Sequence, residues 1–314
     1  KPAYDGFLSL FGQLRNFWRD LNPNVRGAAL VGTGALFLTL MVVCAKFLGS
    51  RLDSLQITFV RSFVGLLFVL PLAFKHGHNI YRTKVPLRHF QRGGIGILGN
   101  TCLFYSVTHL VLADAMALQF SRPLWGVVLA LIILKESVGW RRGLATVIGF
   151  GGILLMTRPF DSGFDPNSIV GALGAVFAAL VIVSIKQLAR SEGTMVIMFY
   201  YAFWGAVLSL PPAVYVWQWP SAADWAVLTA VGSVGIVGQT LVTMGVRQAE
   251  TSVVLPFDYL RIVYAFFIGL WLFDEVPNAY SAAGTVIIVA STLYILIREA
   301  RQKKQEKSEQ KAGA

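Results

Sequence analysis

Long apolar stretches separated by short polar segments run through the chain from residue 27 to residue 297. Most stretches have about 20 residues, the length of an α-helix that crosses a bilayer. Internal glycines are frequent and the stretches are too long for membrane strands, whose signature is alternation over segments of about ten residues. The pattern predicts ten spanning helices, at residues 27–48, 54–74, 93–111, 113–134, 141–157, 169–189, 195–217, 226–246, 252–273 and 279–297.

Small and polar residues inside these stretches repeat along the chain. Residues 34–157 match residues 174–297, at an offset of 140 early in the match and 139 later. The matched pairs include Gly34 with Gly174, Lys46 with Lys186, Arg122 with Arg261 and Glu136 with Glu275. Each copy holds five helices, and because five is odd the second copy is inverted in the membrane. The predicted fold is an all-α polytopic membrane protein of two inverted five-helix repeats, an arrangement typical of transporters.

Composition and charge agree with a membrane protein. Hydrophobic residues make up 55% of the chain and charged residues 14%, with a net charge of +11. With the N-terminus in the cytoplasm, twenty Lys and Arg residues, Arg92 among them, lie in cytoplasmic segments, and two, Arg51 and Arg158, lie opposite. The positive-inside rule therefore predicts that both termini are cytoplasmic. Contact with anionic lipid headgroups explains the basic residues, and no nucleic-acid partner is expected.

The chain divides into four predicted segments, residues 1–26, 27–158, 169–298 and 299–314. The first carries apolar residues on one helical face, which predicts an amphipathic helix on the membrane surface, with a flexible tail as the alternative. The second and third are the two repeats. The last is a basic cytoplasmic tail, either disordered or a frayed extension of the last helix. Cys44 and Cys102 lie inside predicted helices, so neither a disulfide nor a metal site is expected.

Charged residues at membrane depth are the best candidates for a substrate site. Each costs about 2.5–3.5 kcal/mol on insertion scales, so it normally faces protein or water. Arg122 and Arg261 are repeat equivalents near mid-membrane, and residues three positions away share their helical faces. These neighbours are Trp125, Tyr264, Gln119 and Asp258. The alternative for Arg261 is a structural ion pair with Asp258; for Arg122 it is a pair with Asp258 across the bundle or hydrogen bonds to backbone carbonyls.

Further polar residues are expected to face the same cavity. Arg61 is another deep cation, and Asn100 and Gln239 follow two glycine ladders whose spacing favours close helix packing. The ladders are Gly93, Gly96 and Gly99, and Gly232, Gly235 and Gly238. Deep arginines outnumber deep carboxylates, and guanidinium groups suit bidentate capture of a carboxylate or phosphate. The predicted substrate is a small anionic or zwitterionic amphiphile, such as an amino acid or its derivative.

Four residues are predicted to gate transport or to couple it to an ion. Lys46 and Lys186 are repeat equivalents near opposite membrane faces. A gating ion pair is one interpretation of them, and snorkelling to the interface is the other. His109 and Asp114 flank the turn between the third and fourth stretches. Protonation there would couple transport to a proton gradient, and a plain exposed turn is the alternative.

Several motifs resemble the EamA family of the drug/metabolite transporter superfamily. They are Arg61 in the second stretch, LADA at 112–115, RPLWGVVLALIILKE at 122–136, MTRP at 156–159 and LPFDYLRIVYAFFIGLWLFDE at 255–275. The resemblance covers nearly the whole chain outside its two ends. It implies ten helices in two inverted halves around a cavity walled mainly by the first, third, fourth, sixth, eighth and ninth helices. It leaves the substrate open, because the superfamily moves amino acids, nucleotides, sugars, vitamins and drugs.

The predicted function is secondary active transport by alternating access, as an exporter or exchanger. The sequence has no nucleotide-binding, metalloprotease or hydrolase-triad motif, so neither an enzyme nor a cofactor or metal is expected. The expected partners are the substrate, membrane lipid and a coupled proton or counter-solute. The chain is expected as a monomer or homodimer in the inner membrane of a bacterial cell. Alternatives are a non-transporting scaffold or lipid-headgroup receptor, an exporter of organic cations or drugs, and a channel, which the absence of charge rings disfavours.

Overall fold

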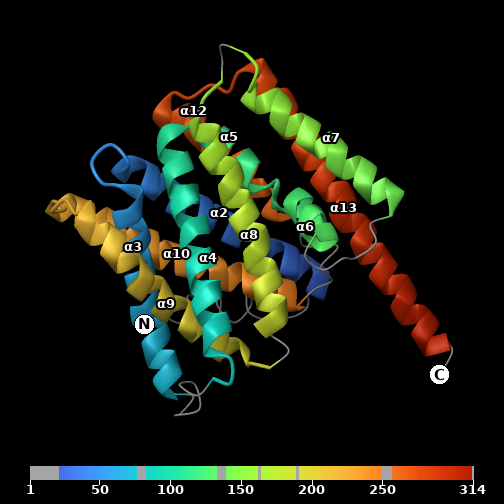
Figure 1. The fold of residues 1–314 in the computed structure, drawn as a ribbon, viewed down its shortest axis with the longest axis horizontal. Coiled ribbons are helices and arrows are strands. Elements are labelled where there is room, and N and C mark those ends of the chain that lie inside the picture. The colour runs from blue at the N-terminus through green and yellow to red at the C-terminus, as the bar shows by residue number, and fades with distance from the viewer. Residues whose placement is uncertain are drawn as a thin grey trace, which may run out of the picture.

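The computed structural model describes residues 21–75, 83–132, 139–161, 164–188, 191–248 and 257–312, and within these ranges every regular element is helical (Figure 1). The helices are α2 (Pro23–Leu48), α3 (Ser54–Lys75), α4 (Pro86–His109), α5 (Leu112–Gln119), α6 (Arg122–Ile132), α7 (Trp140–Thr157), α8 (Asn167–Leu188), α9 (Thr194–Tyr215), α10 (Ala222–Gln248), α12 (Leu260–Phe273) and α13 (Ala279–Ala312). They pack into one bundle.

Each of the ten apolar stretches predicted from the sequence contains helix where the structure describes it. Among the described helices, α2, α3, α8, α9, α10 and α13 are long and apolar enough to cross a membrane by themselves. The stretch at 113–134 differs from the prediction, because it holds two short helices, α5 and α6, with a break between them. This break shapes the candidate site.

The two ends of the chain extend the bundle differently. The predicted amphipathic segment lies outside the described residues except for its end, where α2 already begins at Pro23. The Asn22 side chain caps this start by accepting a hydrogen bond from the N–H of Asn24 at 2.9 Å. At the other end α13 continues to Ala312 and extends beyond the bundle (Figure 1). The backbone of the basic segment is thus an extension of the last helix.

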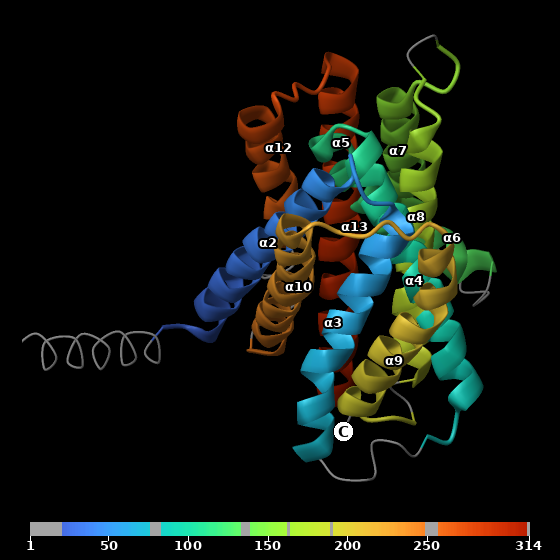
Figure 2. The same ribbon diagram turned by 90° about the vertical axis from the view of Figure 1, so that its left-hand side faces the viewer.

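Helices related by the repeat make related contacts. α2 packs along α10, and their repeat equivalents α8 and α4 pack along each other. α3 packs on α9 and α7 on α13, so each of these pairs joins a helix to its own equivalent. Figure 1 shows α7 beside α13 at one edge, and Figure 2 shows α2 beside α10 at another. This pairing is the one expected of two halves related by a pseudo-two-fold axis.

Glycines allow the paired helices to approach backbone to backbone. A Cβ atom added at Gly34 of α2 would lie 2.9 Å from the carbonyl oxygen of Gly238 in α10. One added at Gly238 would lie 3.0 Å from the carbonyl oxygen of Gly34. In α4, a Cβ atom at Gly99 would lie 3.3 Å from the Cβ of Phe177 in α8. The ladder glycines at these positions therefore serve close packing between repeat-related helix pairs.

Large aromatic side chains are exposed near the ends of several helices. Tyr215 and Trp219 lie at and after the end of α9, Trp271 lies in the last turn of α12, and Phe160 follows α7. Aromatic rings are enriched where membrane helices meet the headgroup region. The exposed rings are therefore consistent with a bundle surrounded by lipid.

Candidate functional site

Arg122, the first of the predicted deep cations, begins a helix directly after a break. α5 ends at Gln119, the chain turns through two residues, and α6 starts at Arg122. Pro123 explains the break, because it has no N–H to donate to the carbonyl of Gln119 and its ring clashes with that carbonyl. The hydroxyl and N–H of Ser121 instead donate to the carbonyl of Leu118, at 2.6 and 3.0 Å.

The second repeat has a break at the equivalent position. Tyr259 turns the chain ahead of α12, which begins at Leu260, so Arg261 lies in the first turn of its helix. Ile262 stands where the first repeat has Pro123, so a proline at that place does not cause this break. The N–H of Ile262 donates to the carbonyl of Tyr259 at 3.0 Å, a tighter turn than the α-helical one. Broken helices at equivalent depths commonly form the binding sites of repeat-built transporters.

The two breaks bring both arginines onto one carboxylate. Nη2 of Arg122 lies 3.2 Å from Oδ2 of Asp258, and Nη2 of Arg261 lies 2.6 Å from Oδ1. The first contact joins the two repeats. The side chains of Arg122, Asp258 and Arg261, called here the Arg–Asp–Arg cluster, are exposed by only 27%, 13% and 15%. Both ion pairs considered from the sequence are therefore present at once, on a single aspartate.

An aromatic pair lies beside the Arg–Asp–Arg cluster. The guanidinium carbons of Arg122 and Arg261 lie 5.2 and 5.8 Å from the centroid of the Phe120 ring. The rings of Phe120 and Tyr259 have their centroids 4.8 Å apart. These two aromatic residues are repeat equivalents at the breaks, and neither was selected from the sequence. The signal that would have found them is the offset of 139, which places an aromatic residue two positions before each arginine.

The Arg–Asp–Arg cluster carries a formal charge of +1, because two guanidinium groups share one carboxylate. In the part of the chain that the structure describes, no other carboxylate lies within 4.0 Å of either arginine. The Nε of Arg261 is buried without a hydrogen-bond partner. A buried positive charge with unused N–H donors favours the binding of an anion through charge-assisted hydrogen bonds.

Trp125 and Gln119, predicted beside Arg122, contact other helices. The Trp125 ring packs edge-on against Phe150 of α7 at a centroid distance of 4.7 Å, and its buried Nε1 has no hydrogen-bond partner. Gln119 faces α8, where its Oε1 lies 3.3 Å from the position of a Cβ atom added at Gly174. Trp125 therefore supports α6 from within its own repeat, and Gln119 faces the other repeat.

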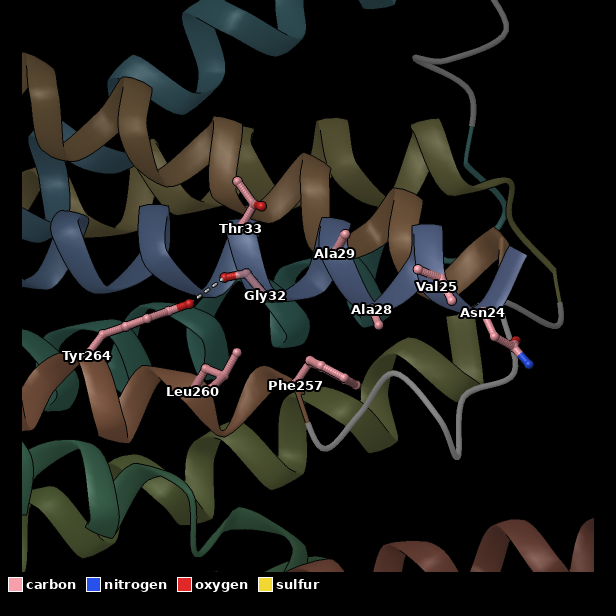
Figure 3. A pocket seen from close by; sticks show the side chains of 9 residues that line it. All are labelled: Asn24, Val25, Ala28, Ala29, Gly32, Thr33, Phe257, Leu260 and Tyr264. Carbon is pink, nitrogen blue, oxygen red and sulfur yellow. Dashed lines mark hydrogen bonds between the residues drawn. The ribbon is translucent and has the colours of Figure 1, made fainter. Parts of the chain in front are cut away.

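Tyr264, predicted beside Arg261, closes one end of a groove between α2 and α12 (Figure 3). Its hydroxyl donates to the carbonyl of Gly32 at 3.5 Å. The groove has a volume of about 550 Å³ and mainly apolar walls. It is lined by Asn24, Val25, Ala28, Ala29, Gly32, Thr33, Phe257, Leu260 and Tyr264. Phe257 and Leu260 flank the second helix break, so the groove adjoins the backbone that carries the Arg–Asp–Arg cluster.

Arg61 and Asn100, also predicted at the cavity, meet at Tyr201 of α9. The side-chain amide of Asn100 donates to the Tyr201 hydroxyl at 2.9 Å, and Arg61 lies beside the same hydroxyl. The guanidinium carbon of Arg92 lies 4.4 Å from the centroid of the Tyr201 ring. Arg61 and Tyr201 are repeat equivalents of different type, and the structure brings them together. Gln239 is exposed on α10.

Lys46, near the end of α2, contacts three acceptors at one end of the bundle. Its Nζ donates to the carbonyls of Val107 and Leu110 at 3.0 and 2.7 Å and lies 2.6 Å from Oε1 of Glu275. The other oxygen of Glu275 accepts from the N–H of Leu112 at 2.8 Å. The Lys46 side chain is 9% exposed, so it does not extend to the surface. We call these contacts the Lys46 latch, which links α2, the end of α4, the start of α5 and the residues after α12.

The other predicted gating residues lie near this latch, apart from Lys186, whose side chain is outside the described residues. His109 is exposed, and its ring stacks on Tyr105 at a centroid distance of 4.0 Å. Oδ2 of Asp114 accepts from the hydroxyl of Ser281 in α13 at 2.9 Å, while its buried Oδ1 has no hydrogen-bond partner. Over the described ranges, no group of three His, Cys, Asp or Glu side chains is placed to hold a metal ion.

Two segments of the chain, one in each repeat, match a known family. A model of the EamA-like transporter family matches residues 25–158 and 167–297. The chain belongs to the EamA-like transporter family. Membership, together with the long apolar helices, makes this EamA-like protein a membrane transporter of a small metabolite.

Relatives of this EamA-like transporter are named for different substrates and for different directions of transport. An S-adenosylmethionine uptake transporter of Rickettsia felis is 31% identical over 275 residues, covering 86% of this chain and 94% of that protein. A pseudopaline exporter of Pseudomonas aeruginosa is 30% identical over 270 residues, covering 85% and 94%. A solved structure with 20% identity and a TM-score of 0.58 covers 87% of this chain and 98% of its own, and it supports the fold alone.

Proposed function

We propose that this EamA-like transporter is a secondary active transporter of a small anionic or zwitterionic amphiphile, such as an amino acid or its derivative. The observation that carries the proposal is the Arg–Asp–Arg cluster, which places one uncompensated positive charge at the paired helix breaks. A carboxylate held by Arg122 and Arg261 would neutralise that charge. An ammonium group of the same substrate would pair with Asp258, and the Phe120 ring would face its apolar part.

The relatives support an amino-acid derivative as the substrate. S-adenosylmethionine, for which the Rickettsia felis relative is named, contains an α-amino acid whose carboxylate and ammonium groups suit the cluster. The surplus positive charge disfavours export of an organic cation that has no carboxylate, and family membership disfavours a non-transporting scaffold or lipid receptor. The named relatives include both an uptake transporter and an exporter. We propose export or exchange, coupled to a proton or a counter-solute.

The proposed mechanism is alternating access by ten spanning helices in two inverted five-helix repeats, residues 27–158 and 169–298, with both termini in the cytoplasm. The related packing of α2 with α10 and of α8 with α4 supports the inverted arrangement. The charge of the short connecting segments supports the orientation. The proposed location is the inner membrane of a bacterial cell, as a monomer or homodimer.

The substrate site is tested by binding and exchange. The purified protein is first screened by thermal shift against amino acids, S-adenosylmethionine, nucleosides, organic acids and vitamins. The exchange of a labelled form of the ligand that binds is then measured in proteoliposomes. Arg122→Gln and Arg261→Gln should each weaken binding and exchange about 10- to 100-fold, the equivalent of one charge-assisted interaction. Arg158→Gln is the matched control, because Arg158 forms an ion pair with Asp161, three residues along, outside the cluster. Unchanged exchange in both cluster variants would refute the site.

We also propose that the Lys46 latch is a gate, because it links four segments at one end of the bundle. Lys46→Met leaves Glu275 with one hydrogen bond from Leu112 and unlinks α2. The exchange rate is expected to fall about 10-fold while the Kd for the substrate changes less than about two-fold. Arg51→Met is the control. Arg51 lies just after the end of α2 and forms an ion pair with Asp224, but its side chain is 55% exposed, so loss of this pair should have little effect. Loss of binding in parallel with exchange would indicate a structural role instead.

A further inference from the structure

Arg92 is buried in the interface between α4 and α9. It lies in the second turn of α4, its exposed fraction is 7%, and its guanidinium group covers the Tyr201 ring. The Nε and Nη1 atoms have no hydrogen-bond partner. The positive-inside count places this arginine in a headgroup-facing segment, where water and phosphates would satisfy it. Its donors are instead enclosed by protein.

A second cation lies at the same tyrosine. Arg61 reaches the Tyr201 hydroxyl from α3, and Asn100 donates to that hydroxyl from α4 at 2.9 Å. In the described ranges of the chain, no carboxylate lies within 4.0 Å of Arg61 or Arg92. N–H donors and two positive charges from α3 and α4 thus meet the hydroxyl of Tyr201 from α9, without a counter-ion among the described residues. A buried and unpaired charge of this kind is costly unless an anion accompanies it.

The glycines of α4 make room for this arrangement. A Cβ atom added at Gly96 would lie 2.8 Å from Nη1 of Arg92 and 2.8 Å from the Tyr201 ring. One added at Gly94, on another side of the helix, would meet nothing closer than a methyl group of Leu208 at 3.9 Å. Gly96 therefore serves the Arg92 guanidinium, in addition to the packing that its ladder predicts.

We propose that Arg61, Arg92, Asn100 and Tyr201 form a second binding site, for a small oxyanion that carries a carboxylate or phosphate group. The two guanidinium groups supply charge-assisted donors, and the Asn100 amide and Tyr201 hydroxyl supply neutral ones. The site is distinct from the Arg–Asp–Arg cluster, because its side chains come from α3, α4 and α9 and include no carboxylate of their own. It does not rest on the proposed transport of an anion through Arg122 and Arg261.

The test measures binding of inorganic phosphate and of acetate to the purified full-length protein by calorimetry and thermal shift. Wild-type protein and Arg122→Gln should bind at least one of the two anions, whereas Arg92→Gln and Arg61→Gln should bind it at least about 10-fold more weakly. Arg88→Gln is the matched control, because Arg88 is an exposed arginine one turn earlier in α4. Binding of phosphate but not acetate would show that the site accepts phosphate groups only. Binding of acetate would show that the site also accepts carboxylates.

A second pair of variants keeps every charge and so separates binding from loss of folding. Gly96→Ala should displace the Arg92 guanidinium and weaken anion binding, whereas Gly94→Ala should leave it unchanged. Binding that survives Arg122→Gln but is lost in Arg92→Gln and Gly96→Ala would support the second site. No binding of either anion to wild-type protein, or equal binding to Arg92→Gln, would overturn it. Binding lost in Arg122→Gln alone would also overturn it, since the anion would then belong to the Arg–Asp–Arg cluster.

Discussion

Asp258 is the residue on which the candidate site depends. Its two oxygens contact two guanidinium groups, one from each repeat, at 3.2 and 2.6 Å. The aspartate therefore holds the repeats together at mid-bundle and at the same time leaves half of the local positive charge for a ligand. Either arginine alone with Asp258 would form a neutral pair with little attraction for an anion.

Asp258→Asn is expected to destabilise the fold more than loss of an arginine. The substitution leaves two largely buried guanidinium groups without a counter-ion, at a cost of about 3–5 kcal/mol. Arg122→Gln leaves the Asp258–Arg261 pair intact and is expected to cost about 1 kcal/mol. Thermal unfolding of both purified variants in one detergent measures the difference. Equal losses of stability would contradict the role of Asp258 as a shared counter-ion.

The sequence made the charged members of the cluster predictable, because Arg122, Arg261 and Asp258 are rare residue types within apolar stretches. It did not distinguish Phe120, because aromatic residues occur throughout these stretches and the one local sign of the break, Pro123, does not point to a particular neighbour. Arg92 shows a different limit. Counting charges near helix ends uses distance along the chain, whereas burial of this side chain depends on α9, which lies about 100 residues later.

At the level of the helices, the two breaks decide where the site lies. The sequence pattern predicts one continuous helix over 113–134, in which Arg122 would share a helical face with Gln119 and Trp125. The break after Gln119 makes Arg122 the first residue of α6, so its side chain extends back toward the turn and Phe120. Hydropathy averaged over about 20 residues does not detect such a break, because the turn has only two residues and apolar helices lie on both sides.

Pro123→Ala is expected to favour a continuous helix and to slow transport. The new N–H can donate to the carbonyl of Gln119, which stabilises the segment by about 1 kcal/mol, while the Arg122 guanidinium moves away from Asp258. The expected results are a higher melting temperature and exchange reduced about 10-fold or more. Pro71→Ala is the control, since Pro71 also lies within a helix, α3, and is exposed. Equal effects of the two substitutions would contradict this account of the break.

For the whole molecule, the repeat accounts for the observed helix pairs but gives no information on the chain ends. Equivalent helices had to make equivalent contacts, and α2 with α10 and α8 with α4 do so. The sequence alone allowed two alternatives for the residues after 298, because a segment rich in Lys, Glu and Gln suits both a solvated helix and a disordered tail. In the structure α13 extends to Ala312.

Inversion predicts opposite exposure of two equivalent turns. Ser50 follows α2 and Ser191 follows α8, both are exposed, and they occupy nearly equivalent places in the two repeats. In a variant whose Cys44 and Cys102 are replaced by Ala, a membrane-impermeant maleimide should label Ser50→Cys in intact cells. It should label Ser191→Cys only after the cells are permeabilised. Labelling of both from the same side would contradict inverted repeats.

α2 has two very different boundaries with its neighbours. Toward α10, Gly34 and Gly238 leave no space for even one methyl group. Toward α12, a hydrogen bond of 3.5 Å from Tyr264 crosses a groove of about 550 Å³. Shear along the first boundary would meet hard atomic contact over several turns, whereas the second needs the loss of that bond and of the ion pair between Lys46 and Glu275. A rigid pair of α2 and α10 would therefore part from α12 first, and the parting edge is the one next to Arg261 and Asp258.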